Sequence, residues 1–145
     1  MATTVMTRVM RLANSAHSSL YRLTRGRMAS TVKGLPVLLL TVAGRKSGTP
    51  HTVPCVYVDE GDSWLVAGTA GGAPDEPQWF RNLRATDHAE VEVAGIRRPV
   101  TVEVLSGPER DAAWQRFVAA SPSFEDYQRK VERTMPVAVL TPGPP

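Results

Sequence analysis

The chain has 145 residues, of which 42% are hydrophobic and 21% charged, the composition of an ordinary globular protein. This length predicts one domain with a core of its own, and the single cysteine, Cys55, excludes a disulfide framework within the chain. The net charge of +3 is unevenly distributed, because all 14 acidic residues lie from Asp59 onward. This asymmetry favours an anionic partner for the N-terminal part.

The N-terminal segment, residues 1–34, carries positive charges and no acidic residue. Apolar residues recur in it at helical spacing, which predicts a basic amphipathic helix followed by a loop. Packing of this helix on its own domain is the favoured interpretation. The alternatives are a peripheral contact with an anionic membrane surface and, ranked last, an organelle transit peptide. No apolar run reaches the roughly 20 residues of a membrane span, and no secretory signal is recognisable. We therefore expect a cytoplasmic protein, with membrane association as the alternative.

The next part of the chain predicts an antiparallel meander. An apolar run from Pro36 to Ala43 is typical of a buried strand. A polar turn over 44–49 follows it. Extended segments over 51–58 and 64–69 are then separated by the turn-forming residues 59–62.

Helices and further strands are predicted after a glycine-rich loop over 70–77. The helices begin at start signals: Pro77 at a first turn, a capping box from Ser106 to Glu109, and the cap Ser121-Pro122. Helix 78–85 follows the loop, strands cover 89–93, 98–105 and 135–141, Gly95 forms a turn, and 142–145 is a tail. The elements predict an α+β domain over 1–145 with about six mostly antiparallel strands. The predicted domain has an N-terminal helix, one helix after the third strand and two helices before the last strand. Its sheet is expected to curl into a small barrel.

The turn over 44–49 carries the clearest chemistry. Arg45 and Lys46 supply charged donors, and Ser47 and the turn amides supply neutral ones. Charge-assisted hydrogen bonds to phosphate or carboxylate are about twice as strong as neutral ones, so the turn suits an anion. The alternative is a solvated basic hairpin. Neither a phosphate-binding P-loop nor a dinucleotide fingerprint is present. No Cys/His spacing predicts zinc, and the aromatics do not interleave with the basic run as nucleic-acid binding requires.

Five motifs in register resemble one family. They are Gly34 to Thr41, Gly44-Arg45-Lys46-Ser47-Gly48, Gly71-Gly72 with Pro77 to Leu83, Pro122 to Tyr127, and Arg133-Thr134 with Pro136-Val137. Together they resemble the deazaflavin (F420)-dependent nitroreductase family, in its Ddn-like branch. The resemblance implies a split β-barrel like that of FMN-binding proteins and an actinobacterial type of host. It also implies coenzyme F420 as cofactor and hydride transfer to quinones, nitroaromatics or activated C=C bonds.

The resemblance also implies which residues form the site. It places Thr69 and Tyr127, with water as the alternative, as proton donors, and Ser121, Phe124 and Tyr127 around the substrate. For Trp79 and Phe80 the alternative is core packing. The implied cofactor-binding residues are Arg45, Lys46, Ser47, Gly48, Thr49, Pro50, His51, Pro54, Val56, Ala67, Gly68, Thr69, Ala70, Gln78, Trp79, Phe80, Arg81 and Asn82.

The chain departs from the family pattern at five of these positions. Ala70 replaces a loop lysine, Val56 replaces a tyrosine beside the ring, and Ser121 and Phe124 replace tyrosines of the substrate pocket. Thr69 replaces a serine near the ring and keeps the hydroxyl. A less polar pocket is therefore expected. The sequence leaves open an F420 carrier or sensor without turnover, and an FMN- or haem-binding protein on the same barrel. It also leaves open the oligomeric state and the acceptor, which is expected to be a small molecule.

Overall fold

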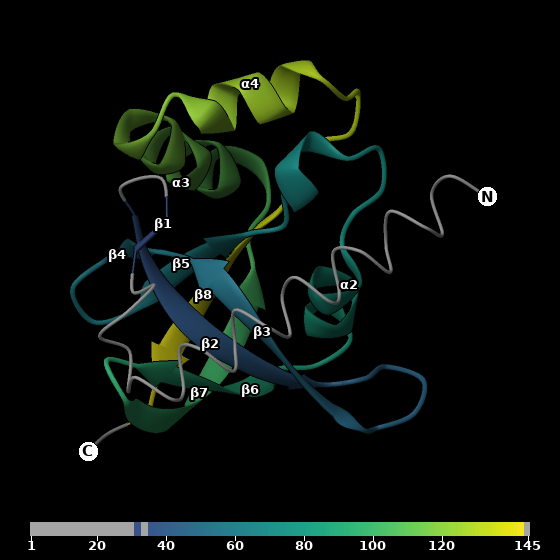
Figure 1. The fold of residues 1–145 in the computed structure, drawn as a ribbon, viewed down its shortest axis with the longest axis vertical. Coiled ribbons are helices and arrows are strands. Elements are labelled where there is room, and N and C mark those ends of the chain that lie inside the picture. The colour runs from purple at the N-terminus through teal and green to yellow at the C-terminus, as the bar shows by residue number, and fades with distance from the viewer. Residues whose placement is uncertain (1–30, 33–34, 144–145) are drawn as a thin grey trace.

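The computed structural model describes residues 31–32 and 35–143, so the predicted N-terminal helix lies outside the described residues. Within this part, eight strands form one sheet and four helical segments pack around it (Figure 1). The strands are β1 (Thr31–Val32), β2 (Leu35–Ala43), β3 (Pro50–Val56), β4 (Val58–Asp59), β5 (Trp64–Ala67), β6 (His88–Val93), β7 (Ile96–Val104) and β8 (Val137–Pro142). The helical segments are the 3₁₀ turn η1 (Ala70–Gly72), α2 (Gln78–Arg84), α3 (Gly107–Ala120) and α4 (Ser123–Arg129).

The sheet closes on itself. Its order is β1-β2-β6-β7-β8-β5-β4, with β3 on the other edge of β2, and every pair is antiparallel. β3 continues into β4 through Tyr57, whose N–H donates to the Pro36 carbonyl at 3.0 Å. β3, which pairs with β2, and β4, at the far end of the strand order, are thus consecutive in the chain, and this connection closes the sheet into a barrel. This architecture is the split β-barrel that the family resemblance predicts.

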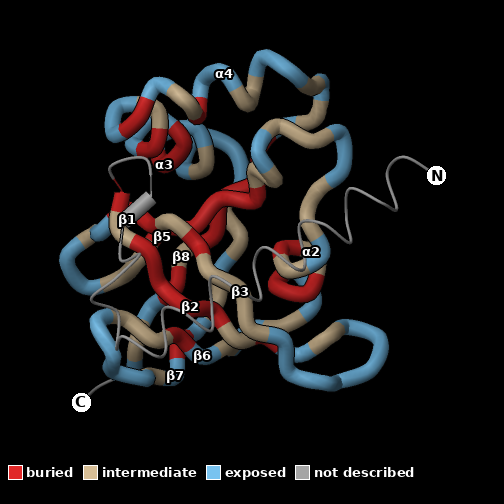
Figure 2. The backbone as a smooth tube through the Cα atoms, in the orientation of Figure 1, coloured by how far each residue is buried: buried red, intermediate tan, exposed pale blue. Residues whose placement is uncertain are grey.

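Two clusters of buried residues form the core, and Figure 2 shows where the buried residues lie along the backbone. Alternate side chains of β2 enter the first cluster, because successive residues of a strand point to opposite faces. β2 and α2 contribute to this cluster the residues Leu38, Leu40, Val42, Phe80 and Leu83. α3, α4 and the segment before β8 contribute to the second cluster the residues Trp114, Phe117, Phe124 and Met135. In Figure 1, α3 and α4 lie together above the sheet and α2 lies beside it.

The predicted meander is wrong in one respect. β2 and β3 form the expected hairpin, with Leu40 opposite Val53. The third predicted strand, β5, pairs with β4 and β8 instead of β3. The chain bends at Tyr57, and only the short β4 remains beside β5. That bend closes the barrel, and no local sequence pattern signals it.

Several predicted boundaries also differ. β5 ends at Ala67 instead of Thr69, because Thr69 is already in the right-handed helical region (φ −82°, ψ −34°). β8 extends to Pro142, so the predicted tail loses its first residue. Ser106 is the N-cap residue of α3, as predicted, but its side chain forms no capping hydrogen bond. The N-cap residue of α4 is Pro122, and α4 likewise has no side-chain cap, so the predicted capping by Ser121 is wrong. No helix in the described part of the chain is both long and apolar enough to cross a membrane.

Candidate functional site

The basic turn between β2 and β3 has a closed shape. The N–H of Gly44 donates to the Thr49 carbonyl, and the N–H of Gly48 donates to the Gly44 carbonyl, each at 2.8 Å. The Thr49 N–H also donates to Ser47 Oγ at 3.1 Å. A Cβ at Gly44 would lie 2.9 Å from Ser47 Oγ and 3.1 Å from His51 Nε2, so any other residue at position 44 would displace one of these side chains. The turn leaves its two cationic side chains exposed.

Arg45 joins this turn to α2. Its Nη1 atom donates to Asn82 Oδ1 at 2.8 Å, and its backbone N–H donates to the same oxygen at 3.1 Å. Its Nη2 atom donates to Gln78 Oε1 at 2.8 Å. Gln78 and Asn82 are four residues apart and therefore lie on one face of the helix. Two separate sequence motifs thus form one structural unit.

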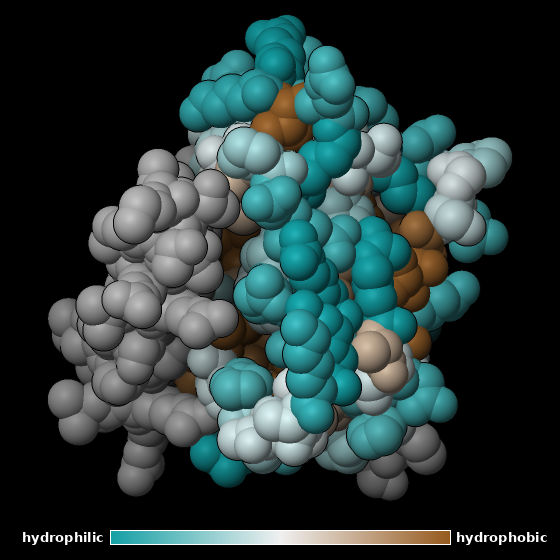
Figure 3. Space-filling view, turned by 90° about the vertical axis from the view of Figure 1, so that its right-hand side faces the viewer, coloured by the Kyte–Doolittle hydropathy of each residue, from teal (hydrophilic) through white to brown (hydrophobic). Residues whose placement is uncertain are grey.

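The surface between the turn and α2 is cationic. Within residues 31–32 and 35–143, Arg45, Lys46 and Arg81 form no ion pair, whereas Arg84 pairs with Glu76 at 2.9 Å. The partners of Arg45 are neutral amides, which leave its charge uncompensated. Figure 3 faces this side of the molecule, and hydrophilic side chains run down its centre. An anion bound here would gain charge-assisted hydrogen bonds without displacing a carboxylate.

The loop after β5 adds backbone donors. Thr69 is right-handed, and Ala70, Gly71 and Gly72 follow with φ of 48°, 63° and 86°. The N–H of Gly72 donates to the Thr69 carbonyl, and that of Ala73 to the Ala70 carbonyl. The N–H groups of Ala70 and Gly71 have no partner in the described part of the chain. Successive N–H groups in right-handed and then left-handed residues form a concave nest that binds anions.

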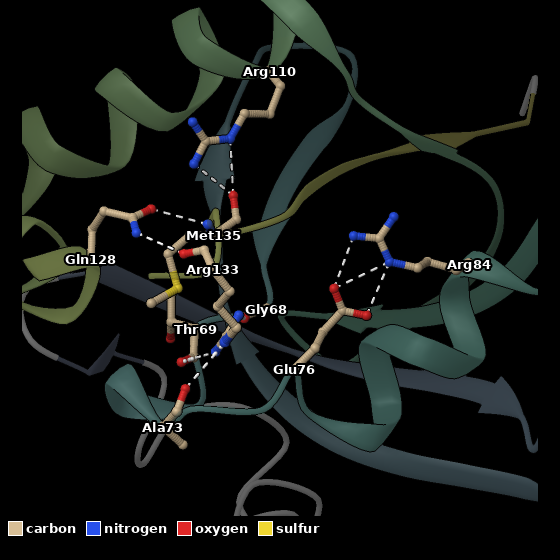
Figure 4. Close-up of polar contacts among 9 residues, drawn as sticks. All are labelled: Gly68, Thr69, Ala73, Glu76, Arg84, Arg110, Gln128, Arg133 and Met135. Carbon is tan, nitrogen blue, oxygen red and sulfur yellow. Dashed lines mark hydrogen bonds and ion pairs between the residues drawn. The ribbon is translucent and has the colours of Figure 1, made fainter. Parts of the chain in front are cut away.

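The structure adds Arg133, which the sequence analysis does not place in the site. Its guanidinium donates to the carbonyls of Gly68 at 3.1 Å, Thr69 at 2.9 Å and Ala73 at 3.1 Å (Figure 4). Burial lowers the pKa of this guanidinium, and the nearby carboxylate of Glu76 opposes that shift. The motif Arg133-Thr134 was visible in the sequence. Nothing in it indicates a partner 60 residues or more away.

Some predicted site residues are core residues. Phe80 is fully buried in the first cluster, and Trp79, half-buried, meets it edge to face at 5.4 Å between ring centroids. Ala67 and Gly68 are buried as well. A Cβ at Gly68 would lie 2.9 Å from the Phe80 ring and 2.9 Å from Pro136 Cγ. Phe80 therefore supports the start of the glycine-rich loop from the core side.

The predicted substrate residues lie on α4 and just before it. Ser121 and Phe124 are buried, with Phe124 inside the second core cluster. Tyr127 is half-buried and meets Phe124 edge to face at 5.7 Å. A Cβ at Gly72 would lie 3.2 Å from the Tyr127 carbonyl oxygen, so α4 packs directly on the glycine-rich loop. The two predicted proton donors, Thr69 and Tyr127, thus come from adjacent segments.

The remaining predicted positions lie along β3. Pro50 and His51 are exposed at its start. Pro54 and Val56 are half-buried and, by strand alternation, lie on the face opposite Cys55. Burial raises the pKa of the Cys55 thiol. The thiol therefore stays neutral at physiological pH, which makes Cys55 a poor nucleophile.

A separate surface groove contains none of the predicted site residues. It has a volume of about 390 Å³ and lies between the turn at residues 60–63 and the start of α3. Glu60 and Arg116 form an ion pair on its edge. In the described ranges, no group of three or more His, Cys, Asp or Glu side chains could hold a metal ion.

The fold and the site define a split-barrel protein with a cationic surface for an anionic ligand. The donor set comprises uncompensated cations, neutral amides and a backbone nest, which fits a cofactor with a phosphate and carboxylates. The family model of the F420H(2)-dependent quinone reductases matches residues 13–142. The chain belongs to this family.

Individual relatives agree. The F420H(2)-dependent quinone reductase Rv1261c of Mycobacterium tuberculosis (strain ATCC 25618 / H37Rv) is 34% identical over 129 residues, which cover 86% of this chain and 87% of the relative. A solved structure of an F420-H2 dependent reductase, FDR-A, is 33% identical with a TM-score of 0.66, and the match covers 72% of this chain and 93% of the other. A structure described as a domain-swapped dimer is 29% identical with a TM-score of 0.67, and the match covers 85% of this chain and 98% of the other.

Proposed function

We propose that this protein is an F420H2-dependent reductase that transfers a hydride to a small quinone-type acceptor. One observation carries the proposal: Arg45 fastens the basic turn to α2 through neutral partners, and leaves a cluster of uncompensated cations on a fixed frame. When bound, reduced F420 supplies the hydride. The protein supplies position, charge and exclusion of water.

The anionic tail of the cofactor would be held from two sides. Arg45, Lys46 and Arg81 would contact its phosphate and carboxylates, because their charges are free for a ligand. The N–H groups of Ala70 and Gly71 would donate to a phosphate oxygen. These amides offer an anion contact that does not depend on a lysine at position 70.

The ring and the acceptor would lie between β3 and α4. Pro54 and Val56 present a half-buried apolar surface for a flat ring. The hydroxyls of Thr69 and Tyr127 are the protein groups proposed to donate a proton to the reduced acceptor. General acid assistance of this kind is typically worth about 10²–10⁴-fold in rate.

Cofactor titration tests the proposal. Tryptophan fluorescence of the purified protein would be followed during titration with F420 and, in parallel, with FMN. F420 alone should give saturable, salt-sensitive quenching. Because each charged hydrogen bond contributes about 1.5–3 kcal/mol, Arg45→Ala and Lys46→Ala should each weaken F420 binding about tenfold or more. Arg97→Ala, on the β6–β7 hairpin, is the matched control and should bind normally. An absence of F420 binding by the wild-type protein would refute the assignment.

Turnover separates the enzyme from a carrier. Reduced F420 would be oxidised with menadione, a nitroaromatic compound and an activated enone as acceptors, each in steady state. Oxidation with menadione supports the reductase. Binding of F420 without turnover of any acceptor supports the carrier or sensor. Yellow colour or a Soret band in the purified protein would support the FMN or haem alternative.

We also propose that the protein self-associates, and we keep membrane contact of residues 1–34 as the alternative to their packing on the domain. The related domain-swapped dimer supports the first point, and the excess of cations in the N-terminal segment supports the second. Light scattering would measure the oligomeric state. Sedimentation with anionic vesicles, compared with neutral vesicles, would measure membrane contact, and equal binding to both would contradict the electrostatic explanation.

A further inference from the structure

Arg133 occupies an unusual position for a half-buried cation. Its three guanidinium nitrogens donate to three backbone carbonyls of one loop, those of Gly68, Thr69 and Ala73 (Figure 4). It forms no ion pair in the described part of the chain. A surface arginine ordinarily pairs with carboxylates or water. The guanidinium of Arg133 faces backbone oxygens instead, which indicates that its role is to hold the conformation of this loop.

These contacts also set the direction of the loop amides. In a trans peptide the C=O and the following N–H point in opposite directions, and the described part of the chain contains no cis peptide bond. Because the carbonyls of Gly68 and Thr69 point at Arg133, the N–H groups of Thr69 and Ala70 point away from it. The Ala70 amide is one of the two that lack a partner.

The loop needs such support because its backbone is strained. Ala70 has φ of 48°, a left-handed conformation that a residue with a Cβ adopts at a cost in energy. Two left-handed glycines follow it. Charge-assisted hydrogen bonds from Arg133 to both ends of this segment stabilise the strained form.

Arg133 is itself anchored by two helices. Gln128 of α4 donates through Nε2 to the Arg133 carbonyl at 2.8 Å and accepts at Oε1 from the Met135 N–H at 3.0 Å. Arg110 of α3 donates to the Met135 carbonyl from Nε at 2.9 Å and Nη2 at 2.7 Å. The backbone that carries Arg133 is therefore held from two directions, and its guanidinium is a rigid support.

We propose that Arg133 is a positioning residue that holds the loop from Gly68 to Ala73 with its free amides turned toward the anionic part of F420. This inference rests on the proposed function, since it assigns how one part of that cofactor site is built. Arg133 acts through the loop, from the side of the loop opposite the proposed cofactor. It acts on cofactor affinity and leaves the chemical step unchanged.

The first test needs no cofactor. Hydrogen exchange of the loop amides would be compared in cofactor-free wild-type protein and in Arg133→Met, which keeps an unbranched apolar stem and removes the donors. Exchange at Gly72 and Ala73, whose N–H groups donate to the Thr69 and Ala70 carbonyls, should rise about tenfold, while amides of β2 and β7 keep their protection. Arg129→Met is the matched control, because Arg129 lies exposed on α4 and, among the residues that the structure describes, pairs only with Glu125 and Asp126. Unchanged exchange in the loop would overturn the proposal.

The second test uses F420. Arg133→Met should raise the Kd of F420 and the KM of reduced F420 about tenfold, with kcat and the acceptor KM changed less than about twofold. Arg133→Lys keeps the charge with one donor group, and its Kd for F420 should lie between those of the wild type and Arg133→Met. If Arg133→Met does not fold, the Kd of Arg133→Lys tests the proposal. A wild-type Kd in both variants, or equal losses in kcat and in KM, would overturn the proposal. If wild-type protein binds no F420, the proposed function fails, and the exchange experiment still decides whether Arg133 holds the loop.

Discussion

The contact between Arg45 and Asn82 gives the most direct test of how the site is assembled. Asn82 is 7% exposed, and its Oδ1 atom accepts both the backbone N–H and the guanidinium of Arg45. Asn82→Ala removes both hydrogen bonds. A charged hydrogen bond contributes about 1.5–3 kcal/mol and a neutral one about 0.5–1.5 kcal/mol. Because the Arg45 side of the contact is exposed, water replaces part of the loss, and we expect about 1–2 kcal/mol in the free energy of unfolding.

The same substitution should weaken F420 binding. Without Asn82 the turn must be ordered when the ligand binds, and about 1.4 kcal/mol of ordering corresponds to a tenfold increase in Kd. Urea unfolding would measure the stability, and fluorescence titration would measure the affinity. Gln78→Ala, which loses only the exposed contact at 2.8 Å, should show a smaller change in both.

A second variant separates anchoring from charge. Asn82→Asp keeps an acceptor for both donors of Arg45 but places a negative charge beside the anion site. It should keep the wild-type stability and still bind F420 more weakly. If Asn82→Ala lost the expected stability and bound F420 with the wild-type Kd, the turn would need no anchor on α2, and the reasoning would be refuted.

Three further predictions follow from the packing of the core. Gly68→Ala would place a Cβ 2.9 Å from Phe80 and Pro136. It should lower the free energy of unfolding by about 1–3 kcal/mol, whereas Gly143→Ala, with nothing within 4 Å, should have no effect in the same urea titration. The Cys55 thiol should resist Ellman's reagent in the native protein and react once the protein is unfolded in urea, because its pKa is raised by burial; rapid labelling of native protein would contradict this. The raised pKa of Cys55 also means that the unfolded state loses its thiol proton first as pH rises. Relative to Cys55→Ala, the wild type should therefore lose stability above about pH 8.5, by up to about 1.4 kcal/mol per pH unit, and parallel pH profiles would refute the point.

The sequence by itself determined the local elements. The apolar run that became β2, the turn at Gly95 and the helix after Pro77 all appear close to their predicted positions. Each follows from periodicity or from backbone preferences that neighbouring residues decide. The family resemblance went further and pointed to the split barrel and to F420, because motifs preserve a tertiary arrangement that periodicity does not encode.

Tertiary structure alone decided how the site is held together. Arg45 meets Asn82 across 37 residues of chain, and Arg133 meets the loop carbonyls across 60 to 65 residues. Such contacts exist only after the barrel closes at Tyr57, which no local pattern signals. The residue types of Arg133 and Ala70 are visible in the sequence, but the direction in which a guanidinium or an amide points depends on the packing of distant segments. That direction determines whether a polar group supports the loop or remains free to bind a ligand.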